Sequence, residues 1–147
     1  MKRGMTRREL EITNVDEIKE ILDKSKVVHI AMVDQGEPYM VAMNYGYTYE
    51  EEKLTLYVHG ATKGRKIDVM KANPNVFVEM ECDMEPFAGK LPCQYGMAYA
   101  SVMGKGKAVI LEDPKDKMDA LTILMKTQTG KDFESSATME NLRRRGA

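Results

Sequence analysis

The strongest constraint on the fold is a succession of short segments with strand character, joined mostly by turns rather than by helices. Residues 26–34 (KVVHIAMVD) and 39–49 (YMVAMNYGYTY) are rich in β-branched and aromatic residues and flank the glycine-containing connection QGEP, which has hairpin length. Residues 54–60 alternate apolar and polar positions as a third strand, and 75–82 and 98–111 are a predicted fourth and fifth. Sequential hairpins favour a small antiparallel barrel over a parallel sheet of βαβ units.

Three helices are predicted between these strands or after them. Residues 14–24 follow good N-cap residues and place apolar side chains on one helical face. A second helix covers residues 64–71 and is stopped by the Asn-Pro pair that follows, and a third covers residues 115–127. The stretch 83–97 contains two prolines and two glycines, so it is expected to be a long loop, of the kind that is often functional.

The length and charge of the chain limit the classes of function. The 147 residues suit one domain with a single core. Because 22 basic residues nearly balance 23 acidic ones, no overall field attracts nucleic acid or an anionic membrane. No apolar run approaches the roughly 20 residues needed to cross a bilayer, so a soluble, cytoplasmic protein is expected. Cys82 and Cys93 are interpreted as reduced thiols without a metal or redox role.

The segment HGATKGRK, residues 59–66, concentrates positive charge where a helix is predicted to begin. It is not a Walker A loop, because three residues rather than four separate its glycines and no Lys-Ser or Lys-Thr follows. It also lacks the glycine spacing of a dinucleotide-binding fingerprint. The free amides of a helix start favour an anion such as phosphate. A solvated basic turn is the alternative that the motif leaves open for its three cations, Lys63, Arg65 and Lys66.

The histidines and tyrosines each allow two interpretations. His59 could donate a hydrogen bond to a cofactor or substrate beside the anion, or it could be structural. His29 lies within an apolar run and is expected to be a structural barrel residue. A tyrosine series could form a stacking surface for a flat ring, although cross-strand packing is commoner; its members are Tyr39, Tyr45, Tyr47 and Tyr49.

Three segments together resemble the pyridoxamine 5′-phosphate oxidase-like flavoproteins, and within them the branch related to nitroimidazole-resistance proteins. These segments are HIAMVDQGEPYMVAMNYGY, LYVHGATKGRKIDVMKANPNVFVE and YASVMGKGKA. The likeness covers about residues 1–133. It implies a mainly β, FMN-binding split β-barrel of about six antiparallel strands with a few flanking helices. Such proteins are usually homodimers that hold the flavin in a cleft between subunits.

The resemblance also implies which residues would hold the cofactor. The strand Val41–Asn44 would run beside the isoalloxazine ring, largely through backbone groups, and Ser101 matches a polar position near the flavin. Arg65 and Lys66 would grip the phosphate, and His59 corresponds to an active-site histidine. The full cofactor-binding set comprises Val41, Ala42, Met43, Asn44, His59, Gly60, Gly64, Arg65, Lys66 and Ser101. The oxidase's own substrate-binding residues have no counterpart here, so vitamin B6 oxidation is not implied.

The leading hypothesis is therefore an FMN-dependent oxidoreductase with catalytic His59, acting on a small electron-poor molecule such as a nitroaromatic. The alternative is a non-catalytic flavin or haem carrier, with His59 or His29 as an axial ligand. A nucleic-acid-binding barrel is disfavoured, because no aromatic residues lie beside its candidate phosphate contacts, which are Arg7, Arg8 and Arg143–Arg145.

One domain, residues 1–147, is expected, with a basic arm at 1–13 and an atypical tail at 134–147. The tail is polar and charged where relatives continue into another strand, which is expected to leave a barrel edge unpaired.

Overall fold

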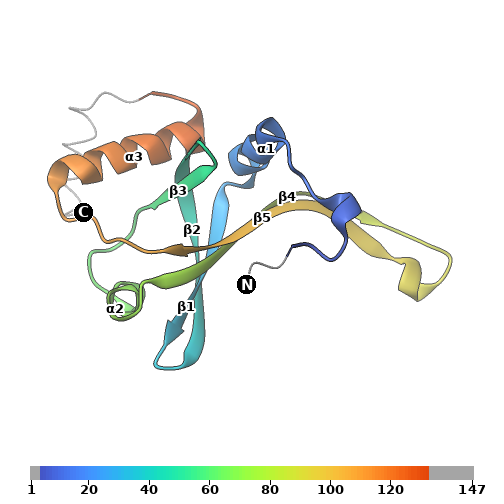
Figure 1. Cartoon of the computed structure of the whole chain (residues 1–147), viewed down its shortest axis with the longest axis horizontal. Coiled ribbons are helices and arrows are strands. Elements are labelled where there is room, and N and C mark those ends of the chain that lie inside the picture. The colour runs from blue at the N-terminus through green and yellow to red at the C-terminus, as the bar shows by residue number, and fades with distance from the viewer. Residues whose placement is uncertain (1–3, 133–147) are drawn as a thin grey trace.

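The computed structural model describes residues 4–132, which form a mainly β domain with helices around an antiparallel sheet (Figure 1). The described residues contain five strands, against the about six expected: β1 (Val27–Asp34), β2 (Glu37–Glu50), β3 (Lys53–Val58), β4 (Asn75–Phe87) and β5 (Gly96–Lys107). The three predicted helices are confirmed as α1 (Val15–Ser25), α2 (Arg65–Ala72) and α3 (Pro114–Thr129), and two short 3-10 helices are present, η1 (Arg8–Leu10) and η2 (Pro92–Gln94).

Strand β2 divides the sheet into two parts. Its residues 37–44 pair with β1, and its residues 45–50 pair with β3. The strand order is β3-β2-β1-β4-β5, so β1 and β4 lie inside the sheet and the helix α2 connects β3 to β4. The mainly β, antiparallel arrangement agrees with the expected split barrel, although the sheet in residues 4–132 is not closed.

The core lies between the sheet and its helices. It consists of eight buried side chains from the strands and from α1 and α2: Leu22, Val28, Ile30, Met32, Tyr45, Val69, Met70 and Met80. Tyr45 is fully buried, while Tyr39, Tyr47 and Tyr49 pack against the core. Packing therefore accounts for the tyrosine series. The helix α3 lies over β2 and β3 (Figure 1).

The predicted loop at residues 83–97 is a loop only at its centre, residues 88–95, because β4 runs to Phe87 and β5 begins at Gly96. Strands β4 and β5 continue beyond the main sheet as a hairpin arm, with a register shift between Cys82 and Glu85, and the arm projects from the body (Figure 1). Pro86 is tolerated because β1 pairs with β4 only at residues 77–79, so one edge of β4 is free in the arm. The arm exposes large apolar side chains: Met84, Phe87, Leu91, Tyr95, Met97 and Tyr99.

Three other expectations concern the ends and the thiols. Within residues 4–132, no helix is long and apolar enough to span a membrane. The atypical tail at 134–147, including Arg143–Arg145, lies outside the described residues, as does the very start of the basic arm. Cys82 is buried and Cys93 is exposed, and both are free thiols.

Replacing Tyr45 by Phe is expected to destabilise the fold by about 1–2 kcal/mol. The Tyr45 hydroxyl is buried and donates a hydrogen bond to the backbone oxygen of Leu22 in α1, so the substitution removes the donor of a buried carbonyl. Urea unfolding of the two proteins would measure the difference. Tyr49→Phe is the matched control, with an expected change within about 0.5 kcal/mol, and equal losses for the two variants would contradict the assignment.

Candidate functional site

A recess of about 340 Å³ lies where β2 changes partner, next to the end of β3 and the start of α2. Six of the ten predicted cofactor-binding residues line it: Ala42, Met43, Asn44, His59, Gly60 and Lys66. They come from three separate elements or their ends. Leu124 of α3 completes the lining, and no local pattern in the sequence marks that residue.

The chain reaches this recess as it leaves β3. The sequence predicted a strand that included His59 and Gly60. In the structure the strand ends at Val58, so these two residues follow it. A Cβ atom at Gly60 would lie 3.0 Å from Cε and 3.3 Å from Nζ of Lys66. The Lys66 side chain therefore lies across Gly60, which brings its ammonium group to the recess.

The start of α2 differs from the starts of the two longer helices. Asn14 accepts backbone hydrogen bonds at the start of α1, and Asp113 does so at the start of α3. The N-cap of α2 is Gly64, which has no side chain to accept such bonds and has φ +145°, a conformation that favours glycine. The first amides of α2 therefore lack a capping side chain, and an anion would satisfy them.

Arg65 does not line the recess. Its Nε lies 3.0 Å from Oδ2 of Asp34 at the end of β1, and its guanidinium carbon lies 4.0 Å from the centre of the Tyr39 ring. The side chain is thus held against the β1–β2 hairpin by an ion pair and a cation–π contact. Of the two cations predicted to bind phosphate, Lys66 is the one that the structure places at the recess.

Three more predicted residues lie outside the recess lining. Val41 packs against the core, and Gly64 lies at the start of α2. Ser101 is on β5, opposite Glu81 of β4, so β1 and β4 separate it from the recess residues of β2. Within one chain, the structure therefore does not bring Ser101 together with the other predicted residues.

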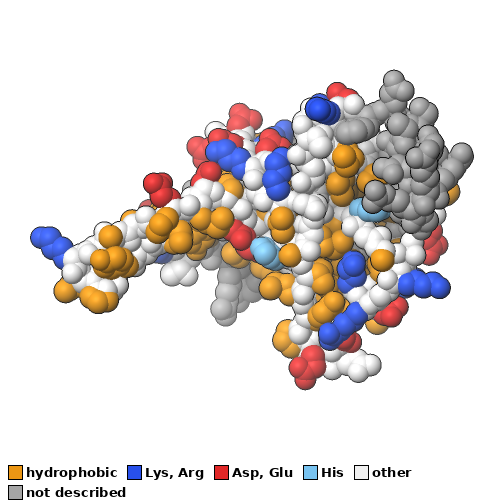
Figure 2. Space-filling model, turned by 180° about the vertical axis from the view of Figure 1, so that it is seen from behind, with side chains coloured by type: hydrophobic (Ala, Val, Ile, Leu, Met, Phe, Trp, Pro, Cys, Tyr) orange, Lys and Arg blue, Asp and Glu red, His pale blue; other side chains and the backbone are white. Residues whose placement is uncertain are grey.

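A second hollow, of about 300 Å³, was missed by the sequence reasoning. It is lined by His29 and Ala31 of β1, Met40 of β2, and Phe77 and Glu79 of β4. Figure 2 shows apolar side chains gathered over one face of the molecule and along the hairpin arm. Strict alternation along β1 and β4 could have placed these residues on one face, but only the pairing of the two strands shows that they meet.

Comparison with known proteins agrees with this architecture. The family described as pyridoxamine 5′-phosphate oxidase matches residues 14–144. Among curated proteins, none matches the sequence.

Several solved structures are similar to this one. A candidate 5-nitroimidazole antibiotic resistance protein from Bacteroides thetaiotaomicron is 30% identical, with a TM-score of 0.69 over 86% of this chain and 75% of that chain. A FAD-binding protein from Mesorhizobium loti is 26% identical, with a TM-score of 0.54 over 86% and 84%. A flavocytochrome from Azotobacter vinelandii shares the fold at 14% identity, with a TM-score of 0.69 over 92% and 64%. With a family match over most of its length and these structural relatives, the chain belongs to the pyridoxamine 5′-phosphate oxidase family.

Proposed function

We propose that this protein binds FMN in the recess and uses it as an oxidoreductase. The observation that carries the proposal is the position of Lys66 beside the uncapped start of α2, next to the exposed residues Ala42 and Asn44 of β2. A phosphate at the helix start would interact with both the first amides and the ammonium group. The flavin ring would then lie along β2, within reach of backbone groups of residues 41–44.

The residues around the recess suit the two ends of FMN. Lys66 and the α2 amides supply positive charge at one end, and Met43 and Leu124 supply apolar surface. Arg65 would have to leave Asp34 to reach the phosphate, so its contribution depends on that competition. Bound FMN would supply the hydride or electron transfer, while the protein supplies binding and orientation.

His59 is the residue of the recess best suited to handle a proton. Imidazole exchanges protons near neutral pH, and reduction of a nitro group consumes protons as well as electrons. We propose that His59 hydrogen-bonds the flavin or the substrate and that the substrate is a small electron-poor molecule such as a nitroimidazole. The similarity to the candidate resistance protein, at 30% identity, supports this choice of substrate class.

A second copy of the chain would complete the site. The face of the sheet that carries Ala42 and Asn44 also carries several exposed apolar side chains. Among them, Met40, Phe77 and Met103 are 62%, 40% and 61% exposed. Exposed apolar surface of this kind marks interaction sites. We propose a homodimer with the flavin in the cleft between subunits, an arrangement in which Ser101 of one subunit could lie near the flavin of the other.

The purified full-length protein should show flavin absorbance, or acquire it when FMN is added. Fluorescence quenching during an FMN titration should saturate at one flavin per chain, and light scattering should give twice the mass of one chain. Loss of nitro-group absorbance from a 5-nitroimidazole, with a chemical reductant to recharge the flavin, would test the reaction. A protein that stays colourless with FMN and shows a Soret band with haem would instead support the haem carrier.

A further inference from the structure

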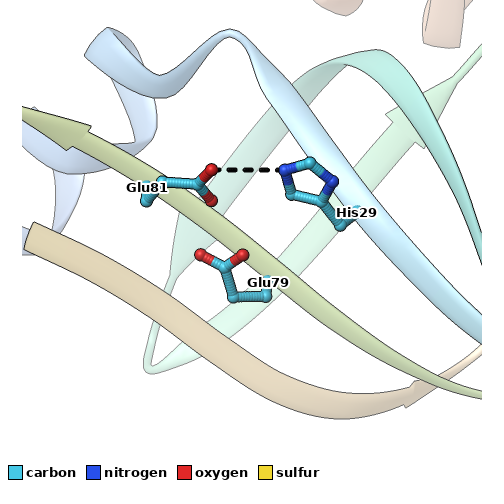
Figure 3. A group of neighbouring side chains, drawn as sticks. All are labelled: His29, Glu79 and Glu81. Atoms are coloured by element: carbon cyan, nitrogen blue, oxygen red, sulfur yellow. Dashed lines mark hydrogen bonds and ion pairs between the residues drawn. The ribbon is translucent and has the colours of Figure 1, made fainter. Parts of the chain in front are cut away.

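A cluster of potential metal ligands lies on the sheet, outside the recess. It consists of His29 of β1 and Glu79 and Glu81 of β4 (Figure 3). His29 and Glu79 are directly opposite each other across the two strands, and Glu81 follows Glu79 on the same face because strand side chains alternate. Potential ligand atoms of the three residues all lie within 4.8 Å of one another.

The donors face one another and are held by rigid elements. Strands β1 and β4 are interior strands of the sheet, so neither can move without breaking its pairing. Figure 3 shows the two carboxyl groups and the imidazole converging on a common space. Nε2 of His29 lies 3.3 Å from Oε1 of Glu81, and these side chains are only 32% and 31% exposed.

One carboxylate oxygen of this cluster lacks a hydrogen-bond partner. Among the described side chains, Oε2 of Glu81 is the buried polar atom without a hydrogen-bond partner. Such an atom normally costs stability unless something binds it. Glu79 and Glu81 lie on the same face of β4, so a cation between them would offset the repulsion of two neighbouring carboxylates.

From this geometry we infer that His29, Glu79 and Glu81 form a binding site for a divalent first-row transition-metal ion, with Zn²⁺ as the representative. One imidazole nitrogen and two carboxylate oxygens are donors that Zn²⁺ accepts. Metal–ligand bonds of about 2.1 Å place tetrahedral donors about 3.4 Å apart, so small side-chain rotations would close the site. An ion there would also give Oε2 of Glu81 a partner.

Three protein ligands would leave a coordination position open. In one chain, the hollow of about 300 Å³ is lined by His29 and Glu79 themselves, with Ala31, Met40 and Phe77, so it provides room for a water on the ion. Met40 and Phe77 also belong to the face proposed above to meet a second subunit, so the dimer would enclose this position. Metal binding at this site would not require a flavin, because the donors belong to β1 and β4 and not to the recess residues.

The test is a Zn²⁺ titration of chelator-treated, full-length protein by calorimetry. We expect saturation at one ion per chain, and at least tenfold weaker binding in His29→Gln and in Glu81→Gln. Glu85→Gln is the matched control, since Glu85 is an exposed carboxylate of the same strand, and it should bind within about twofold of the wild type. Absence of saturable binding to the wild type, or unchanged binding in both ligand variants, would overturn the site.

A second measurement does not depend on how the variants fold. Co²⁺ added to the wild-type protein should give visible bands typical of nitrogen and oxygen ligands. A thiolate-to-metal charge-transfer band would overturn the assignment, because it would place the ion on Cys82 or Cys93.

Discussion

A Lys66→Ala variant is expected to bind FMN about 30-fold more weakly than the wild type, which corresponds to about 2 kcal/mol for a lost charge-assisted contact with phosphate. Lys66 is the one cation among the residues that line the recess, and its side chain lies across Gly60. Arg65 could replace its charge only by leaving Asp34. Quenching of FMN fluorescence would measure the dissociation constants. The variant should keep its fold, because the ammonium group is not part of the buried core.

Lys63→Ala is the matched control for this experiment. It removes the same charge from the same turn, but Lys63 is exposed and does not line the recess, so its affinity should stay within about twofold of the wild type. Equal losses in the two variants would show that the turn attracts the phosphate only through its overall charge. Unchanged binding in Lys66→Ala would contradict the proposed position of the phosphate.

Gly46→Ala is expected to destabilise the protein by about 3 kcal/mol, at the upper end of ordinary overpacking. A Cβ atom there would lie 2.5 Å from the backbone nitrogen of Leu124 and 2.8 Å from the carbonyl carbon of Ile123. Both are main-chain atoms of α3 and cannot rotate away. The helix would have to move from β2, which would break the hydrogen bond of 2.8 Å that the Gln128 side chain donates to the backbone oxygen of Tyr45.

Thermal unfolding would measure this effect as a decrease of about 10 °C in Tm. Gly106→Ala is the control, since nothing lies within 4 Å of a Cβ atom at Gly106, and its Tm should change by less than about 2 °C. FMN binding should weaken in Gly46→Ala as well, because Leu124 lines the recess. An unaltered Tm would mean that α3 does not pack against β2 as closely as described.

Residues 83–97 show that local sequence patterns do not fix where a strand ends. Two prolines and two glycines indicated a loop over the whole stretch, but β4 and β5 extend into it from both sides and leave only residues 88–95 between them. A proline is compatible with a strand whose outer edge has no partner. The partner is absent because β1 runs antiparallel to β4 and begins only at Val27. Pairing between distant segments therefore outweighed the local turn signals.

The cation-rich turn shows a similar division. The spacing of HGATKGRK was enough to exclude a Walker A loop and to predict a helix start that attracts an anion. It could not distinguish Arg65 from Lys66, because the direction of each side chain depends on residues far away in sequence. Asp34 and Tyr39 hold Arg65, and Gly60 leaves room for Lys66.

By itself, the sequence determined the order of strands and helices, the uncapped start of α2 and the resemblance to the flavoprotein family, because hydrophobic period, caps and turn residues act over a few neighbouring positions. Only the tertiary structure decided that β2 changes partner at residues 44–45, which creates the recess. It alone also placed His29 opposite Glu79. The physical reason is register: a shift of one residue between strands would turn every one of these side chains to the other face.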